Sequence, residues 1–409
     1  MIGSREKERM CEGEGESMFE RDHVATIVQR LREPRKFMQM VVGPRQTGKS
    51  TSVGQALGKL DVTKVEFSFD RPRDQRARKL EEVWEGARAM LSSCDEVVLS
   101  LDEIQKVPEW SSTVKYLWDE DTRRGRNVKV VLTGSSTLTL QSGIAESLKG
   151  RFEILRSTQW TFSECREAFG YSLDDFLMLG GYPGAAVLKN DAPRWLSYLR
   201  DSIIEPTITQ DVLEMEVVRK PALLRALFEI GALYSSQEIS YRKLLGQLGD
   251  RGNTDVIARY LDLLSHAGLM SGLKKYDEEA LVAKTSSPRL LVHDTSLMTA
   301  SLGNDADRIM SDKALRGHLV ETAVGAYLLA RSQREGFDLR WWRDRGAEVD
   351  FVVTSGRRRT AIEVKSGRVK GTKGLGEFVQ RYPGTYALIV GSEEFPLEDF
   401  LLGKVPLFQ

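Results

Sequence analysis

Residues 41–51, VVGPRQTGKST, contain the residue types that hold phosphate groups. Gly43, Gly48, Lys49 and Ser50 match the pattern G-x-x-x-x-G-K-[ST] at every fixed position. In such a loop the backbone amides at a helix N-terminus point at the anion, the lysine neutralises the β- and γ-phosphates, and the hydroxyl ligates magnesium. We therefore expect ATP or ADP with Mg²⁺. The expected nucleotide-binding residues are Gly43, Pro44, Arg45, Gln46, Thr47, Gly48, Lys49, Ser50 and Thr51.

An acidic pair follows a second apolar run, in EVVLSLDEIQ. Residues 97–101 predict a buried parallel strand that delivers Asp102 and Glu103 to its carboxyl end, where such sheets bind ligands. Asp102 suits a magnesium ligand beside Ser50, and Glu103 suits the base that polarises the attacking water. The alternative is a helix N-cap with an acid in the first turn. The complete phosphate loop favours the catalytic interpretation, because such sites need a magnesium carboxylate.

Two further segments offer partners for a γ-phosphate. In VKVVLTGSSTL, Thr133 or Ser135 ends a strand and can contact the phosphate or the attacking water; the alternative is a hydroxyl that satisfies a turn. In ESLKGRFEILR, Arg151 precedes another apolar run and can reach a γ-phosphate of the same chain or of a neighbouring subunit. A solvent-exposed surface arginine fits the spacing of Arg151 nearly as well.

The C-terminal segment AEVDFVVTSGRRRTAIEVKSG carries a separate acidic constellation. A turn centred on residues 356–357 would place Asp350 across from Glu363, with Lys365 on the same strand face as Glu363. Carboxylates set this way bind Mg²⁺ or Mn²⁺, and a lysine can orient a hydrolytic water. Glu321, on the preceding helix, is a candidate additional ligand. A salt bridge on a solvent-exposed strand is the alternative.

The order of elements predicts how these residues are positioned. Compact β-rich runs alternate with helical spacing up to about residue 165, which predicts a parallel sheet covered by helices on both faces. Glycines and prolines then break the chain at GYPGAAVLKNDAPRW, and residues 196–285 have helical spacing. We therefore expect a charged mobile leader (1–20), a nucleotide-binding core (21–165), a helical region (166–285) and a C-terminal α/β domain (286–409).

Within the helical region, ISYRKLLGQLGDRGNTDVIARYLDLLSHAGLMSGLKKY has the order of a winged helix-turn-helix, a motif that often binds DNA. Its second helix carries Asp255 and Asp262 against a single Arg259, which is poor for phosphate contacts. A packing or protein-contact role therefore fits at least as well.

Composition excludes several classes of protein. Lys plus Arg total 59 and Asp plus Glu total 59, so no global field draws the chain to nucleic acid or a membrane. Cys11, Cys94 and Cys165 lie far apart without a C-x-x-C pair, which argues against a disulfide framework or a structural zinc site. A reducing cytoplasm is the expected location. No apolar run is long enough to span a membrane.

The motifs also stand in a recognisable order. From the N-terminus they read VVGPRQTGKST, LSLDEIQ, VVLTGSST, SLKGRFEILR, GGYPGA, SSPRLLVHDTSL, GHLVETAV, WWRDRGAEVDFVV and AIEVKSG. This order resembles the prokaryotic AAA-type ATPases that carry a C-terminal domain of unknown function with a PD-(D/E)xK nuclease-like core. The resemblance covers the chain from about residue 20. It implies an AAA+ P-loop NTPase module, a helical lid, a winged-helix segment and a nuclease-like α/β domain.

The resemblance also implies roles for single residues. Thr133 or Ser135 would sense the γ-phosphate, and Arg151 would be an arginine finger. In the C-terminal domain, Asp350, Glu363 and Lys365 align with the D…ExK positions and Glu321 with the helical acidic position. Val349 stands where the family usually has proline.

The resulting hypothesis is a magnesium-dependent ATPase whose hydrolysis switches or drives a nuclease-like domain, in a DNA-related or defence process. One alternative is a regulatory NTPase that changes partner contacts with nucleotide state and cleaves nothing. Another is a metal-dependent DNase for which ATP is a regulator. The expected partners are nucleotide, DNA and other protein subunits.

Overall fold

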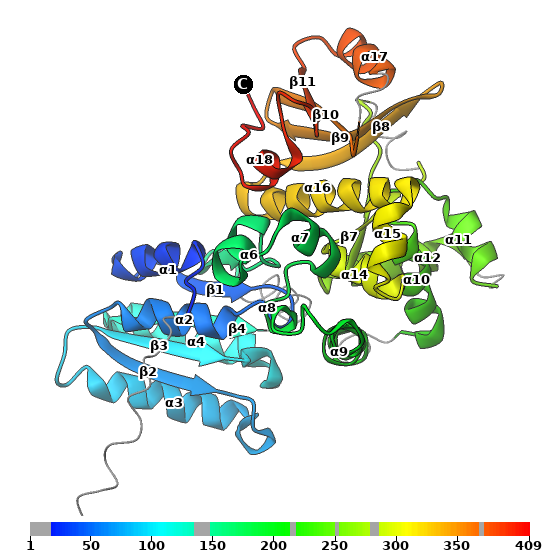
Figure 1. Ribbon diagram of the computed structural model, residues 1–409. Coiled ribbons are helices and arrows are strands. Elements are labelled where there is room, and N and C mark those ends of the chain that lie inside the picture. Colours follow the sequence, from blue (N-terminus) through cyan, green and yellow to red (C-terminus); the bar gives the residue numbers. More distant parts are fainter. Residues whose placement is uncertain (1–17, 135–147, 213–217, 250–252, 279–285, 368–371) are drawn as a thin grey trace, which may run out of the picture.

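The structure is a computed structural model that describes residues 18–134, 148–212, 218–249, 253–278, 286–367 and 372–409. The predicted sensor Ser135 lies outside these ranges. The chain forms three regions, which Figure 1 shows in blue to cyan, in green to yellow, and in gold to red.

The first region is built on a parallel sheet of five strands in the order β2-β3-β4-β1-β5. The strands are β1 (Met38–Val42), β2 (Thr63–Ser68), β3 (Val97–Asp102), β4 (Val128–Gly134) and β5 (Phe152–Arg156). β1 and β4 are buried along their whole length, as their apolar residues require in the middle of a covered sheet. Because β4 lies between β1 and β3, the carboxyl ends of these three strands lie side by side.

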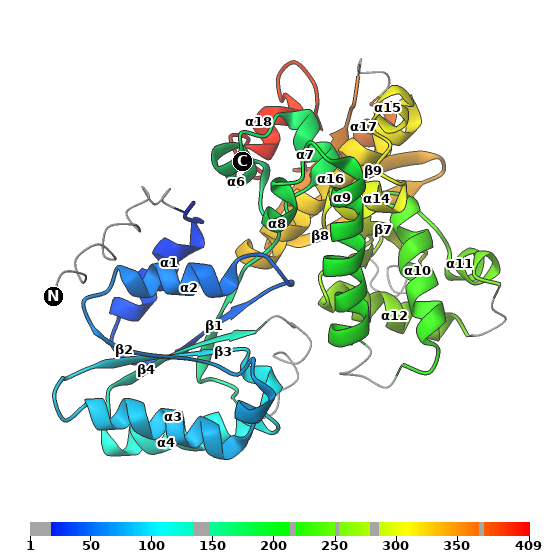
Figure 2. The ribbon, with the colours of Figure 1, turned by 60° about the horizontal axis from the view of Figure 1, so that its bottom comes forward.

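Helices cover both faces of this sheet, as predicted (Figure 2). One face packs against α1 (His23–Arg32) and α2 (Lys49–Gly58), and the other against α3 (Ala77–Met90) and α4 (Trp110–Arg124). Two short 3-10 helices, η1 (Pro72–Asp74) and η2 (Ile104–Lys106), follow β2 and β3.

Residues 18–20, which we expected to belong to the charged leader, contact the first region. Residues 1–17 lie outside the described ranges, but Met18 and Phe19 contact α2, and Glu20 pairs with Lys59, the residue after α2. The Gln55 side chain donates to the carbonyls of Met18 (3.2 Å) and Phe19 (3.1 Å). The first region therefore includes residues 18–20.

The second region is mostly helical. It contains α6 (Phe162–Phe169), α7 (Leu173–Leu179), α8 (Pro183–Ala186), α9 (Ala192–Tyr198), α10 (Pro221–Leu233), α11 (Tyr241–Gln247), α12 (Thr254–His266), β6 (Met270–Leu273), β7 (Arg289–Val292), α14 (Thr295–Ser301) and α15 (Ala306–Ser311). α9 continues without a break through two π-helical stretches, η3 (Leu199–Ile204) and η4 (Thr207–Val212). We call residues 192–212 the coupling helix.

In the structure the second region ends later than the boundary expected at residue 285. β7 pairs antiparallel with β6, so the second region continues past Val292 and ends near α15. The order of elements here is α11, α12, β6, β7, so the two expected helices are followed by a strand that pairs with β7. The winged-helix assignment and its DNA contact stay predictions.

The third region begins with a long helix, α16 (Lys313–Glu335), which is followed by three strands, a helix, a last strand and a short helix, in agreement with the expected α/β domain. The elements are β8 (Asp338–Asp344), β9 (Ala347–Ser355), β10 (Arg358–Val364), α17 (Lys373–Arg381), β11 (Tyr386–Val390) and α18 (Leu397–Leu401). The sheet order is β11-β10-β9-β8; β8, β9 and β10 are antiparallel, and β11 is parallel to β10. α16 and α17 pack against opposite faces of this sheet (Figure 1).

The predicted register of the β9–β10 hairpin is confirmed. Phe351 lies across from Ile362, which puts Asp350 across from Glu363. The pairing of β9 with β8 shifts by one residue near Asp350, so β9 carries a bulge there. The bulge changes the expected alternation, because Val349 packs with the α17 layer whereas Phe351 packs with the α16 layer. Across the described ranges, no helix is long and apolar enough to cross a membrane.

Candidate nucleotide site

The phosphate loop and the acidic strand meet at the carboxyl edge of the first sheet. The Ser50 hydroxyl donates to Asp102 at 3.0 Å (Oδ1) and 3.1 Å (Oδ2). The Thr133 hydroxyl, at the end of β4, also donates to Asp102. Three residues from three separate segments of the chain are thus brought together, because β4 lies between β1 and β3.

Lys49 opens α2 and is buried, with 6% of its surface exposed. Its ammonium donates to the carbonyl of Pro44 within the loop. Burial lowers the pKa of Lys49 to about 8, and the carboxylates of Glu103, Asp211 and Asp102 oppose that decrease. Lys49 is therefore a desolvated cation among three carboxylates, which is the setting in which a phosphate contact is strongest.

Two glycines of the loop are required by its geometry. Gly48 has a φ of 85°, a left-handed conformation that side chains with a Cβ rarely adopt. A Cβ on Gly43 would lie 1.8 Å from the carbonyl oxygen of Ser157. The loop therefore lies against the segment that follows β5 more closely than any other residue type would allow.

Glu103 has the position expected of a catalytic base but an unexpected backbone conformation. Its φ is 54°, which is uncommon for a residue with a Cβ and is seen most often at functional sites. Its Oε2 accepts from the Gln105 side chain at 2.9 Å and lies 3.4 Å from the Lys106 ammonium. In the described residues its side chain makes no capping hydrogen bond to η2, so the capping alternative is not what the geometry shows.

Arg151 lies at the other end of the sheet from the phosphate loop. Its backbone carbonyl accepts from the amide of Met38, the first residue of β1, whereas the loop follows the last residue of β1. The length of β1 therefore separates them, roughly 13 Å. The Arg151 guanidinium pairs with Asp119 on α4, at 2.7 and 3.0 Å. A contact with phosphate in the same chain is excluded by this position, and the neighbouring-subunit role stays a prediction.

A buried arginine that the sequence did not single out supports the loop. Arg21 is 3% exposed and pairs with Glu164 at 2.7 Å. It also donates to the carbonyl of Thr47 at 3.0 Å, and the Trp160 indole donates to the same carbonyl at 3.1 Å. This loop carbonyl is therefore fixed by two donors from opposite ends of the first region's sequence.

The loop is also attached to the second region through three consecutive side chains. Arg45 forms a bidentate ion pair with Asp211 on the coupling helix, with nitrogen–oxygen distances of 2.7 and 2.8 Å. Gln46 accepts from the Tyr198 hydroxyl and donates to the carbonyl of Ser202, both on the same helix. Sequence spacing offered no signal for these contacts, because the partners lie more than 150 positions away.

Pro44 completes this attachment. It packs against the turn after α12, so closely that a Cβ on Gly268 would lie 2.4 Å from the Pro44 ring. Gly268 also has a φ of 77°, which favours glycine on conformational grounds. The tight turn is therefore built for close contact with the phosphate loop.

Acidic residues of the third region surround an arginine side chain. Arg289 of β7 is 2% exposed and donates to Asp350 Oδ1 (3.2 Å), to Glu321 (3.0 Å) and to Glu348 (3.0 Å). Among the residues the structure describes, no group of three or more His, Cys, Asp or Glu side chains is placed to hold a metal ion. The expected second Mg²⁺ or Mn²⁺ site is therefore not supported, since a guanidinium stands among its carboxylates.

The other members of that constellation pair locally. Lys365 donates to Glu363 at 2.7 Å, as the salt-bridge alternative describes. Asp350 Oδ2 accepts from the amide of Val364 at 2.8 Å. Burial raises the pKa of Asp350 to about 7; Arg289 opposes that increase, and the charges of Glu321 and Glu363 add to it.

Comparison with protein families divides the chain at the same places as the structure. Residues 35–166 match a family described as an AAA domain. Residues 170–308 match a domain of unknown function (DUF8612), and residues 316–407 match another (DUF4143). The second match extends past β7 and α14, in agreement with the later boundary of the second region.

The chain is similar to whole proteins from bacteria and archaea. An uncharacterised protein of Mycobacterium tuberculosis is 26% identical over 336 residues, which are 80% of this chain and 69% of that protein. One of Methanocaldococcus jannaschii is 25% identical over 349 residues, 80% of this chain and 74% of that protein. Of solved structures, a Walker-type ATPase of Pyrococcus abyssi matches 70% of this chain and 97% of its own, at 14% identity and a TM-score of 0.47.

The parallel sheet, the phosphate loop and the Ser50–Asp102–Thr133 cluster, together with the family match, define residues 35–166 as an AAA-type P-loop ATPase domain. Nucleotide binding follows from this class. The nuclease-like identity of the third region stays a prediction.

Proposed function

We propose that the chain is a magnesium-dependent ATPase that uses the change from triphosphate to diphosphate to alter the contacts of the phosphate loop with the second region. The observation that carries this proposal is the attachment of three consecutive loop residues, Pro44, Arg45 and Gln46, to the second region. A loop that senses nucleotide and holds a neighbouring region can transmit nucleotide state to it.

The residues at the site fit a magnesium ion. The hydroxyl of Ser50 and the carboxylate of Asp102 are hard oxygen ligands, and they already lie within 3.1 Å of each other. These two residues would hold the ion, which would supply charge neutralisation for the β- and γ-phosphates. Thr133 fixes the Asp102 carboxylate through its hydroxyl.

Glu103 is the residue that supports hydrolysis. The Gln105 amide donates to its carboxylate at 2.9 Å, and the Lys106 ammonium lies 3.4 Å from the same oxygen, so both hold the carboxylate in place. An ionised carboxylate can accept a proton from the attacking water while the water forms its bond to the γ-phosphorus. Lys49 stabilises the negative charge on the phosphates that remain in the loop.

Asp211 supports the switching step. Asp211 is 2% exposed and pairs with Arg45 of the phosphate loop at 2.7 Å, so its carboxylate lies beside the loop that would hold the phosphates. An arginine pairs equally well with a carboxylate or with a phosphate, and two anions repel. ATP binding therefore competes with Asp211 for Arg45, and phosphate release restores their pair.

The third region acts, in this proposal, as a binding module whose position follows the second region. Arg289 comes from β7 of the second region and is buried among carboxylates of the third, which ties the two regions together. The positive charge of Arg289 neutralises the acidic residues that metal-dependent cleavage would use. It therefore favours a regulatory role of the third region over a nuclease role.

Two measurements on one preparation test the proposal. ADP affinity by titration should fall in Lys49→Ala, by about 2 to 3 kcal/mol of lost charge-assisted contact. Phosphate release from ATP should require magnesium and be absent in the variant. Unchanged ADP affinity in Lys49→Ala, or magnesium-independent turnover, would overturn the proposal.

A further inference from the structure

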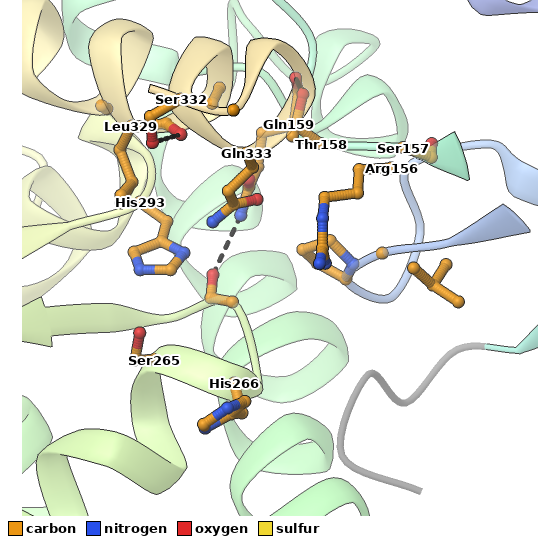
Figure 3. A pocket seen from close by; sticks show the side chains of 17 residues that line it. Arg156, Ser157, Thr158, Gln159, Ser265, His266, His293, Leu329, Ser332 and Gln333 are labelled. Carbon is orange, nitrogen blue, oxygen red and sulfur yellow. Dashed lines mark hydrogen bonds between the residues drawn. The ribbon is translucent and has the colours of Figure 1, made fainter. Parts of the chain in front are cut away.

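A second polar pocket, of about 420 Å³, lies where the three regions meet. Its walls come from the end of β5 and the start of the phosphate loop, from the end of α12, and from the C-terminal half of α16. Figure 3 shows Arg156 extending from its strand toward the middle of this space, with His266 and Gln333 on the other sides. The volume lies within the usual range for small-molecule sites, about 300 to 1,000 Å³.

This pocket is on a different face of the sheet from the nucleotide site. Arg156 pairs in register with Val42, and the strand residues of the same parity, such as Phe152 and Ile154, pack against the α3 and α4 layer. α2, which begins with Lys49, covers the opposite face. Alternation along β5 therefore directs Arg156 away from the helix that holds the phosphates.

Arg156 brings a positive charge to the pocket, and none of the described residues pairs with it. Within the described ranges, its guanidinium makes no hydrogen bond or ion pair, unlike Arg151, which is held by Asp119. Burial lowers the pKa of Arg156, and no neighbouring carboxylate opposes that decrease. A bound anion would therefore stabilise the charged form of this partly buried side chain.

The rest of the lining suits an anion as well. None of the described residues that line the pocket is Asp or Glu. The amide of Gln333 supplies hydrogen-bond donors, whereas the Ser332 hydroxyl already donates to the carbonyl of Leu329 at 2.8 Å and the Ser265 hydroxyl is hydrogen-bonded to Ser271 at 2.6 Å. His293 is neutral, because burial lowers its pKa to about 4, and its Nε2 is hydrogen-bonded to the Ser271 hydroxyl at 2.7 Å.

Apolar side chains of α16 form one side of the pocket. Ala326, Leu329 and Ala330 line it next to the polar groups. An apolar wall beside an unpaired cation fits a ligand that has both an organic part and a charged group. The Gln159 side chain is already used, since it donates to the carbonyl of Gly268 at 3.0 Å, the longer dashed line near the centre of Figure 3.

We propose that this pocket binds a small organic phosphate of about mononucleotide size, with Arg156 as its anion contact. The ligand touches Pro44 of the phosphate loop, the Gly268 turn and α16 at once, since all three line the pocket. Gly43 and Pro44 of the phosphate loop line this pocket, whereas Lys49, Ser50 and Asp102 are not among its described lining residues. An arginine suits phosphate because its planar fork can donate two parallel hydrogen bonds.

The test uses the full chain with the nucleotide site disabled by Lys49→Ala. The melting temperature is followed while AMP or inorganic pyrophosphate is added, with ionic strength kept constant by sodium chloride. We expect a saturable rise, and in Lys49→Ala with Arg156→Gln a half-saturation concentration about tenfold higher or more. Tighter binding of AMP identifies a nucleotide ligand, and equal binding identifies the phosphate group alone; both support the proposal.

Arg32→Gln is the matched control, because Arg32 is an exposed arginine in the last turn of α1. It should titrate like its parent. A melting temperature that neither anion moves, or an Arg156→Gln titration identical to its parent, would overturn the site. Should Lys49→Ala fail to fold, wild type saturated with ADP replaces it in the same titration. Neither outcome depends on whether the phosphate loop hydrolyses ATP.

Discussion

The carbonyl of Thr47 shows how single residues prepare the loop for phosphate. Arg21 and Trp160 both donate to this oxygen. In a planar trans peptide the N–H points opposite to the C=O, so the amide of Gly48 points away from Arg21 and Trp160. The loop amide is thus oriented before any ligand arrives, and phosphate binding does not have to immobilise it.

The role of Glu103 leads to a prediction at the same scale. Glu103→Gln keeps the size of the side chain and its bond from Gln105 but removes the base. We expect ATP to stay bound while turnover falls about a hundredfold or more, the range for loss of a general base. Single-turnover hydrolysis and ATP titration on the same sample measure both effects. Wild-type turnover in Glu103→Gln would show that another group activates the water.

Asp350 gives a prediction for pH. Its pKa is raised in the folded protein, so folding takes up a proton there at moderately acidic pH. The stability that this group contributes is therefore present at low pH and lost as the pH rises through about 7. We expect the stability advantage of wild type over Asp350→Asn, measured by urea unfolding, to be larger at pH 5 than at pH 8. A larger advantage at pH 8 than at pH 5 would mean that the ion pair with Arg289 affects the pKa of Asp350 more than burial does.

The coupling helix is the element that links the nucleotide site to the second region. Its two π-helical stretches carry Ser202 and Asp211, two of its three contacts with the loop. π-helical turns are rare and occur frequently at functional sites. Their presence at these contacts is consistent with a coupling helix whose packing changes when nucleotide binds.

Replacing Asp211 tests that link directly. Asp211→Asn removes the carboxylate that competes with the γ-phosphate for Arg45, so we expect ATP affinity to rise by about tenfold, the value of one charge-assisted contact, and ADP affinity to change little. Arg45→Gln is the control and should weaken ATP binding. Equal losses of ATP and ADP affinity in Asp211→Asn would show that the Arg45–Asp211 pair only holds the loop in shape.

Elements with a strong local pattern were predictable. The apolar runs of β3 and β4 and the spacing of the glycines around Lys49 specify the core sheet and its loop within short segments. The β9–β10 register was predictable because its turn is short and local. The β9 bulge near Asp350 was not, since it depends on how β9 pairs with β8.

Contacts between residues far apart in the chain could not be predicted from the sequence. Arg21 reaches Glu164, Arg45 reaches Asp211, and Arg289 lies among carboxylates of the third region. No spacing rule connects residues so far apart in the sequence. From the sequence alone, each of these arginines would be interpreted as an ordinary exposed side chain. Arg289, which lies among the carboxylates of the predicted metal site, was missed for this reason, because it comes from another region of the molecule.

At the scale of the whole molecule, the second region contacts both of its neighbours through polar groups. Its coupling helix and Gly268 turn hold the phosphate loop, and its β7 strand places Arg289 in the third region. A change at the loop therefore has a continuous route of contacts to the C-terminal sheet. Such a route supports coupling only if the coupling helix responds to nucleotide.

Hydrogen–deuterium exchange of the coupling helix measures that response most directly. The Glu103→Gln chain is compared without nucleotide, with ADP and with magnesium and ATP, and Lys49→Ala serves as the control that should not respond. We predict faster amide exchange across residues 199–212 with ATP than with ADP, because the triphosphate takes Arg45 from Asp211. Identical exchange in the ATP-bound and ADP-bound chains would contradict the nucleotide switch.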